Sequence, residues 1–104
     1  MKISGSYKGG RLTLSFSGEL DHHAARDAMK RLSQKLDAYS PRSCVLDLKG
    51  LDFMDSSGVA LLLRTYKRMN ELDGTMCVRN VRPQPMRVLD ASGIERLIDI
   101  TGAV

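Results

Sequence analysis

The side chains best placed to do chemistry are two adjacent hydroxyls, Ser56 and Ser57, which follow Asp55 and precede Gly58. After them, apolar residues recur at the three- and four-residue spacing of a helix face that packs in a core. The residues on this face are Val59, Leu62, Leu63, Tyr66 and Met69. We therefore expect the serines at the amino end of a helix, where free backbone N–H groups and the helix dipole favour an anion. A hydroxyl in this position is suited to carry a reversible charge.

The same residues also fit a simpler interpretation as helix caps. Asp and Ser are common capping residues, because their side-chain oxygens accept hydrogen bonds from the first N–H groups of a helix. Asp55, Ser56 and Ser57 would then cap the helix and have no further role. A second polar segment, residues 18–23 (Gly-Glu-Leu-Asp-His-His), precedes another amphipathic helix and has Asp21 as its expected N-cap.

Hydrophobic periodicity and turn residues predict the elements that hold these segments. The expected strands cover residues 3–7, 11–17, 44–48, 75–79 and 94–100. The expected helices cover residues 22–38, the stretch from the serines to about 72, and a short stretch from Pro83 to about Gly93. The apolar run 44–48 predicts a strand that is covered on both faces. Alternating strands and helices imply an α/β domain with a mixed, mostly parallel sheet of about four to five strands, an amino-terminal antiparallel hairpin and helices packed on it.

Composition indicates a single soluble globular domain. With 104 residues the chain can build one modest core, and 42% apolar and 27% charged residues are ordinary values for such a protein. No apolar run approaches the roughly 18 residues of a membrane span, and residues 1–5 lack the apolar core of a signal peptide. We therefore expect a cytoplasmic protein that contacts no membrane, with reduced and buried thiols at Cys44 and Cys77.

The net charge of +4 raises the alternative of nucleic-acid binding. However, the sixteen basic residues are spread along the chain, there is no tryptophan, and no run of five like charges occurs. Basic side chains on the first expected helix are typical of a solvated face or of ion pairs with acidic neighbours. We therefore expect no direct nucleic-acid binding, whereas a basic patch that meets an acidic protein partner stays open.

A hydrolase site is a further alternative, because the residue types of a catalytic triad are all present in the two polar segments. These residues are Asp21, His22, His23, Asp55 and Ser56. Adjacent histidines on a helix point in different directions, so only one of them could serve a serine. The chain also has no Gly-x-Ser-x-Gly elbow, no His-Glu-x-x-His metal motif and no glycine-rich phosphate loop. We therefore expect no enzymatic activity, no metal and no cofactor, and interpret the histidines as surface residues.

Taken together, residues 18–23 and the segment 53–58 (Phe-Met-Asp-Ser-Ser-Gly) resemble the STAS-domain anti-sigma factor antagonists, in particular those of the sporulation type. Segments 64–67 and 90–93 are similar to further motifs of that family, so the resemblance runs over nearly the whole chain. It implies a STAS-like fold, which agrees with the mixed sheet expected above. Relatives usually continue with another helix after the final strand, whereas this chain ends at Val104. We expect the surface under that helix to be bare or covered by something else.

The resemblance implies a partner switch. The unphosphorylated protein would bind an anti-sigma factor that is also a serine kinase, and a sigma factor would be released. The kinase would phosphorylate Ser56, the serine directly after the aspartate, and a separate serine phosphatase would restore it. The residues that the resemblance assigns to the partner-binding surface are Gly18, Glu19, Asp21, Asp55, Ser57 and Gly58. The alternative on the same fold is a STAS module that serves no sigma factor, in a stressosome-like scaffold, a lipid-transport system or the cytosolic tail of an anion transporter.

Overall fold

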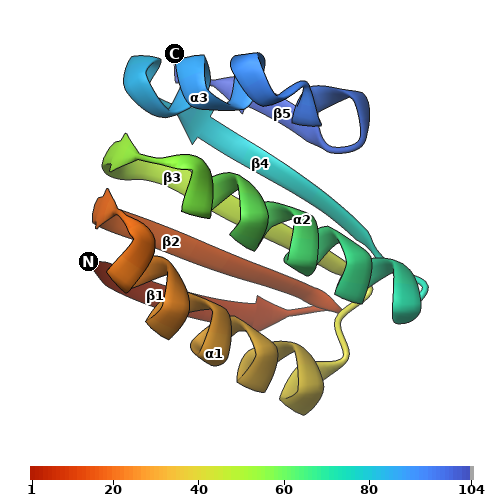
Figure 1. Cartoon of the computed structure of the whole chain (residues 1–104). Coiled ribbons are helices and arrows are strands. Elements are labelled where there is room, and N and C mark those ends of the chain that lie inside the picture. Colours follow the sequence, from red (N-terminus) through yellow and green to blue (C-terminus); the bar gives the residue numbers. More distant parts are fainter. Residues whose placement is uncertain (104) are drawn as a thin grey trace.

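The computed structural model describes residues 1–103 as a five-stranded sheet with helices packed on it (Figure 1). The strands are β1 (Lys2–Lys8), β2 (Arg11–Leu20), β3 (Ser43–Met54), β4 (Thr75–Val81) and β5 (Asp99–Gly102). The helices are α1 (His22–Tyr39), α2 (Ser56–Glu71), α3 (Pro83–Ser92) and a 3-10 turn, η1 (Ile94–Arg96). This order confirms the expected α/β class. No helix within residues 1–103 is both long and apolar enough to cross a membrane.

The strands lie in the sheet in chain order, β1-β2-β3-β4-β5. β1 and β2 form an antiparallel hairpin whose turn contains Gly9 and Gly10, both at positive φ, where glycine is favoured. The other neighbouring strands are parallel. Each parallel pair needs a crossover, and α1, α2 and α3 supply them. The mixed, mostly parallel sheet with an antiparallel amino-terminal hairpin is therefore confirmed.

The three α-helices lie on one face of the sheet, so the prediction of a strand covered on both faces is wrong (Figure 1). Along β3, Cys44, Leu46 and Leu48 are buried, whereas Val45 and Asp47, which alternate with them, are only half-buried. The apolar run suggested two covered faces, but Asp47 already interrupts it. Its carboxylate accepts a hydrogen bond from the side chain of Asn80, at 3.1 Å, on the side that no helix covers.

The core fills the space between the helices and the sheet. In β2, Leu12, Leu14 and Phe16 are buried and alternate with polar residues, as the period of two predicts. The helix α1 buries Ala25, Ala28, Leu32 and Leu36. The expected face of α2 is confirmed in part, because Leu62 and Met69 are buried and Val59 and Tyr66 pack against the core. The fully buried residues of α2 are Gly58, Leu61, Leu62, Thr65 and Met69. Leu63 is 39% exposed, and the core takes Leu61 and Thr65 instead.

Two strands run further than the sequence predicts. The sequence predicts a strand over residues 11–17, but β2 continues to Leu20. Gly18 has φ +105°, and the pairing with β3 shifts its register on either side of this residue, which lets the strand continue. β3 likewise extends to Met54. Both additions carry the strands to the edge where the two polar segments lie.

The last expected strand, residues 94–100, is partly wrong. Gly93 adopts φ +73° and ends α3, as a C-terminal glycine typically does. The chain then forms η1, and Ile94 and Ile98 are both buried at a helical spacing of four residues. Only β5 remains as a strand. Val104, on which the expectation of a bare surface rests, lies outside the described residues.

The two cysteines project from opposite faces of the sheet. Cys44 pairs in register with Met76, and Cys77 pairs with Val45, so the two thiols alternate across neighbouring strands. Cys44 is fully buried and Cys77 half-buried, and both are free thiols, as expected. Burial, and secondarily the nearby Cys77, raises the pKa of Cys44 to about 12. The Cys44 thiol is therefore neutral at physiological pH and behaves as a small apolar side chain.

Candidate functional site

The site lies where the neighbouring strands β2 and β3 end. The pairing of Glu19 with Phe53 and of Leu20 with Met54 brings the two strand ends into register. The backbone N–H of Asp55 also donates to the carbonyl of Leu20, at 3.3 Å. Because both strands run in the same direction, the two polar segments of the sequence meet at one edge of the sheet.

An aspartate caps each of the two helices that begin at this edge. The carboxylate of Asp21 accepts from the backbone N–H of Ala24, at 2.8 Å, and starts α1. The carboxylate of Asp55 accepts from the backbone N–H of Ser57, also at 2.8 Å, and starts α2. Both capping predictions are confirmed. The hydroxyls after Asp55 are therefore not needed as the N-cap, which leaves them available for another role.

The two serines at the start of α2 have different surroundings. Ser56 is exposed, and within residues 1–103 its hydroxyl makes no protein hydrogen bond. Ser57 is half-buried, and its hydroxyl is hydrogen-bonded to Nδ1 of His22 at 3.2 Å. Ser56 lines a groove between α2 and α3, whereas Ser57 lines a cleft between α1 and α2. The hydroxyl of Ser56 is thus the more accessible of the two.

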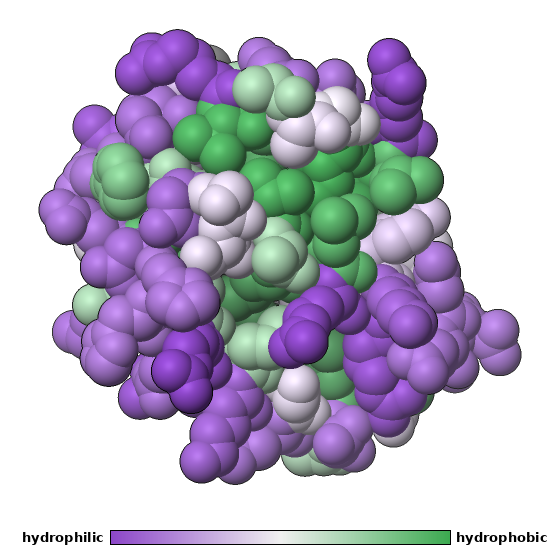
Figure 2. Space-filling view, viewed as in Figure 1, coloured by the Kyte–Doolittle hydropathy of each residue, from purple (hydrophilic) through white to green (hydrophobic). Residues whose placement is uncertain are grey.

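The groove beside Ser56 is mainly apolar. It is lined by Ser56, Val59, Leu63, Arg87 and Val88, among others, and Leu63 is one of the exposed large apolar side chains of the protein. Figure 2 shows that apolar surface gathers between α2 and α3, while the surface over α1 is mostly hydrophilic. The accessible hydroxyl therefore lies at the border of an apolar surface.

Met54, the last residue of β3, is held from two directions. A Cβ atom on Gly58 would overlap the Cγ of Met54, so the glycine allows α2 to start close to the strand. On the other side, the pairing of β3 with β4 ends at Asp47. Within residues 1–103, β3 has no strand partner on this side beyond that residue. At Met54 the side-chain amide of Gln84, from α3, takes this place: it accepts from the N–H of Met54 at 2.8 Å and donates to its carbonyl at 3.0 Å. Gln84 thus replaces a strand neighbour and fixes the residue before Asp55.

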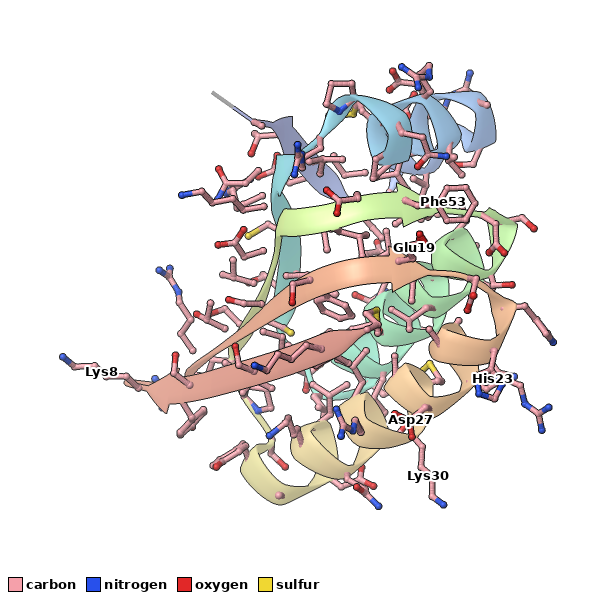
Figure 3. All side chains as sticks on the ribbon, turned by 90° about the vertical axis from the view of Figure 1, so that its left-hand side faces the viewer. Lys8, Glu19, His23, Asp27, Lys30 and Phe53 are labelled. Carbon is pink, nitrogen blue, oxygen red and sulfur yellow. The ribbon has the colours of Figure 1, made fainter. Side chains whose placement is uncertain are left out.

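Several assigned residues are on the surface around the serines. Asp21 and Glu19 are exposed, Asp55 and Gly18 are half-buried, and Gly58 is buried. Gly58 therefore contributes to this site through packing. Figure 3 shows Glu19 beside Phe53 at the strand ends, with Lys8 at the opposite end of the sheet.

Sequence reasoning missed Phe53 and Gln84. Phe53 is 39% exposed. It precedes the buried Met54 in a strand, so the period of two could have predicted its exposure. No local pattern predicts the contact of Gln84, because 30 residues separate it from Met54.

The geometry also bears on the hydrolase alternative. His22 contacts Ser57 and not Ser56, and within residues 1–103 no carboxylate is hydrogen-bonded to His22. His23 is exposed at the start of α1 (Figure 3), and within residues 1–103 no hydrogen bond joins it to either serine. The serine and histidine pair thus has no acid to orient the imidazole, which a catalytic triad requires.

Comparisons with known proteins agree with this architecture. A family model of the STAS domain matches residues 5–104. An anti-sigma F factor antagonist from Paenibacillus polymyxa is 36% identical over 100 residues, which span 96% of this chain and 86% of the relative. The structure of the anti-sigma factor antagonist SpoIIAA in its unphosphorylated form has a TM-score of 0.83 at 24% identity, with 96% of this chain and 88% of that chain covered.

The phosphorylated form of SpoIIAA from Bacillus has a TM-score of 0.74, also at 24% identity, with 96% of this chain and 91% of that chain covered. These structural matches confirm the fold, and the sequence match extends over both polar segments. The chain therefore belongs to the STAS-domain family, among the anti-sigma factor antagonists.

Proposed function

We propose that this protein is a partner switch controlled by phosphorylation of Ser56. In the unphosphorylated state it binds an anti-sigma factor that is also a serine kinase, and a sigma factor is released. The kinase transfers a phosphoryl group from ATP to the Ser56 hydroxyl, whose proton is lost, and the modified protein dissociates. A separate serine phosphatase hydrolyses the phosphoserine and restores binding. The cycle operates in the cytoplasm, and the chain acts as substrate and binding protein without catalysing a step.

The observation that carries the proposal is the exposure of Ser56 beside Asp55 at the amino end of α2. A kinase must reach the acceptor hydroxyl, and Ser56 is the accessible one of the two serines. Support also comes from SpoIIAA, whose structures are described in unphosphorylated and phosphorylated forms. The partner surface that we propose surrounds Ser56 and comprises Glu19, Asp21, Asp55, Ser57 and Phe53, with Gly18 and Gly58 shaping the backbone beneath.

Simple electrostatics explains how such a switch would work. A phosphate adds about −1.5 to −2 charges at pH 7. At the start of a helix this charge is tolerated within the domain, because free N–H groups and the helix dipole favour it. A docked partner, in contrast, would have to desolvate the dianion next to the carboxylate of Asp55. A loss of about 3 kcal/mol weakens binding by about 100-fold, which is enough to release the partner.

The test is phosphorylation of matched serine variants by the kinase-type anti-sigma factor of the same genome, with labelled ATP. Ser56→Ala is expected to abolish incorporation and to retain binding to the kinase. Ser57→Ala is the matched comparison, because it removes the neighbouring hydroxyl: it can weaken binding, since Ser57 lies on the proposed partner surface, but the phosphate should still be incorporated at Ser56. Normal incorporation in Ser56→Ala, or a failure of the wild-type protein to bind any such kinase, would contradict the proposal.

A further inference from the structure

A second feature of this edge is a basic cleft between α1 and α2. It is a cavity of about 240 Å³ that begins at the hydrogen-bonded pair His22 and Ser57. One helical turn further along α1 it is lined by Arg26, and about two turns along α2 by Arg64. The cavity is smaller than the roughly 300–1,000 Å³ of typical small-molecule sites, so its size suits one or two protein side chains.

The charges in this cleft are not balanced within the chain. Its lining contains no carboxylate. Within residues 1–103, four other arginines make ion pairs with aspartates, as Arg31 does with Asp27 on the same helix, at 3.5 Å. Arg26 and Arg64 are not among them. Two guanidinium groups on facing helices, each without an ion-pair partner, form a site that is complementary to a carboxylate.

The rest of the lining is apolar and is supplied by Ala25, Met29, Ala60 and Leu61. An occupant therefore needs an acidic group together with an apolar body or neighbour. These properties describe an acidic side chain in a folded protein surface better than a small inorganic anion, which would leave the apolar wall uncovered.

We propose that this cleft receives an aspartate or glutamate side chain of the anti-sigma partner, held by Arg26 and Arg64. The inference rests on the proposed function, since the cleft is continuous with the surface around Ser56 through Ser57. It adds a cause for the switch. A phosphate on Ser56, the neighbour of Ser57 in the cleft lining, adds negative charge that repels the incoming carboxylate. The proposed contact also means that the two arginines help to determine which anti-sigma factor binds.

The experiment measures Kd by calorimetry for the kinase-type anti-sigma factor of the same genome and unphosphorylated variants. Arg26→Glu and Arg64→Glu are each expected to weaken binding by about tenfold or more, because each repels the acidic side chain. Arg11→Glu is the matched control. It makes the same charge change at an exposed position at the start of β2, away from the cleft, and should alter Kd by less than about threefold.

A double variant separates a local contact from general charge attraction. If both arginines hold one carboxylate, Arg26→Glu with Arg64→Glu loses less affinity than the product of the two single losses. A second readout is the methyl resonance of Met29, which should shift in the complex, whereas that of Met76, at the start of β4, should not.

The outcomes distinguish this inference from the proposed function. If the wild-type protein binds and both single variants have an unchanged Kd, the cleft proposal is overturned and the Ser56 switch stays intact. The same holds if both variants lose only as much affinity as Arg11→Glu. Absence of wild-type binding overturns both. Circular dichroism and thermal unfolding of each variant show whether a loss of affinity comes from the contact, since all three positions are exposed.

Discussion

The carboxyl ends of β2 and β3 have the same local construction but different surroundings. Each strand stops at an aspartate, Asp21 or Asp55, whose carboxylate caps the following helix. Two histidines follow the first cap, and two serines with Gly58 follow the second. The comparison teaches that the cap builds the scaffold, whereas the next two side chains decide which chemistry the strand end can offer.

The two strand ends also differ in how tightly they are held. Gly58 occupies the position in α2 that Ala24 occupies in α1, three residues after the cap. The absence of a side chain lets α2 approach Met54, and Gln84 binds both backbone polar groups of Met54 from the other side. The end of β3 is thus the more constrained one, as the proposed switch requires of the segment that precedes the Ser56 hydroxyl.

The largest difference between the two strand ends is expected in partner affinity when a carboxylate is added at each of them. Ser56→Glu should weaken binding of the anti-sigma factor by about 100-fold, because a second carboxylate beside Asp55 must be desolvated in the complex. His23→Glu adds the same charge at the exposed start of α1 and should change Kd by less than about threefold (Figure 3). Calorimetry measures both. Equal losses would mean that the two strand ends are equivalent for the partner.

The next effect concerns packing behind the caps. Helix propensity alone predicts that Gly58→Ala stabilises α2 by about 1 kcal/mol. The overlap with the buried Met54 predicts the opposite, a destabilisation of about 1–3 kcal/mol. Ala24→Gly is the matched change in α1 and should cost up to about 1 kcal/mol, from propensity only. Urea unfolding distinguishes the two, and a more stable Gly58→Ala variant would show that the two helix starts are packed alike.

Removal of either capping aspartate should destabilise the protein by a similar amount, but the two removals should differ in their effect on function. Asp55→Ala and Asp21→Ala each remove one hydrogen bond to a helix start, so each should lower the free energy of unfolding by about 0.5–2 kcal/mol. Thermal unfolding measures this effect. At saturating kinase, only Asp55→Ala should also slow phosphorylation of Ser56, because it loosens the turn that presents the hydroxyl, whereas Asp21→Ala would act through affinity for the partner. A slower reaction of the same size in Asp21→Ala would argue against distinct roles.

The most local effect is expected for Gln84. Gln84→Ala removes two hydrogen bonds to Met54, at a net cost of about 1–2 kcal/mol. Hydrogen exchange should become faster at the amide of Met54 and stay unchanged at that of Leu20, at the end of β2. Gln84→Glu retains an acceptor for the N–H of Met54 but loses the donor to its carbonyl. In this variant the exchange rate of the Met54 amide should therefore fall between the rates in the wild-type protein and in Gln84→Ala. Unchanged protection of Met54 would show that the amide clamp does not constrain β3.

Much of the fold could be predicted because periodicity and turn residues are local signals. The hairpin, α1, α3 and the mixed sheet follow from the alternation in β2, the apolar stripe of α1 and the prolines and glycine around α3. The errors arise where tertiary context decides. Leu63 fits an apolar stripe, yet the core takes Leu61 and Thr65. Ile94, in the 3-10 turn, and Ile98, just before β5, are buried without belonging to a strand.

The candidate site could be predicted in part for the same reason. The caps Asp21 and Asp55 are local patterns, and they are confirmed. The difference in surroundings between Ser56 and Ser57 could not be predicted, because it depends on a hydrogen bond between Ser57 and His22, 35 residues away. The Gln84 clamp and the cleft between α1 and α2 likewise need contacts between distant segments.

The most direct test of the switch is the affinity of one protein in two states. The wild-type chain is phosphorylated by its kinase, the modified residue is located by mass spectrometry, and Kd for the anti-sigma factor is measured by calorimetry before and after modification. We predict a single phosphate on Ser56 and binding that is weaker by about 100-fold. Equal affinity of the two forms, or a phosphate on another residue, would contradict the switch.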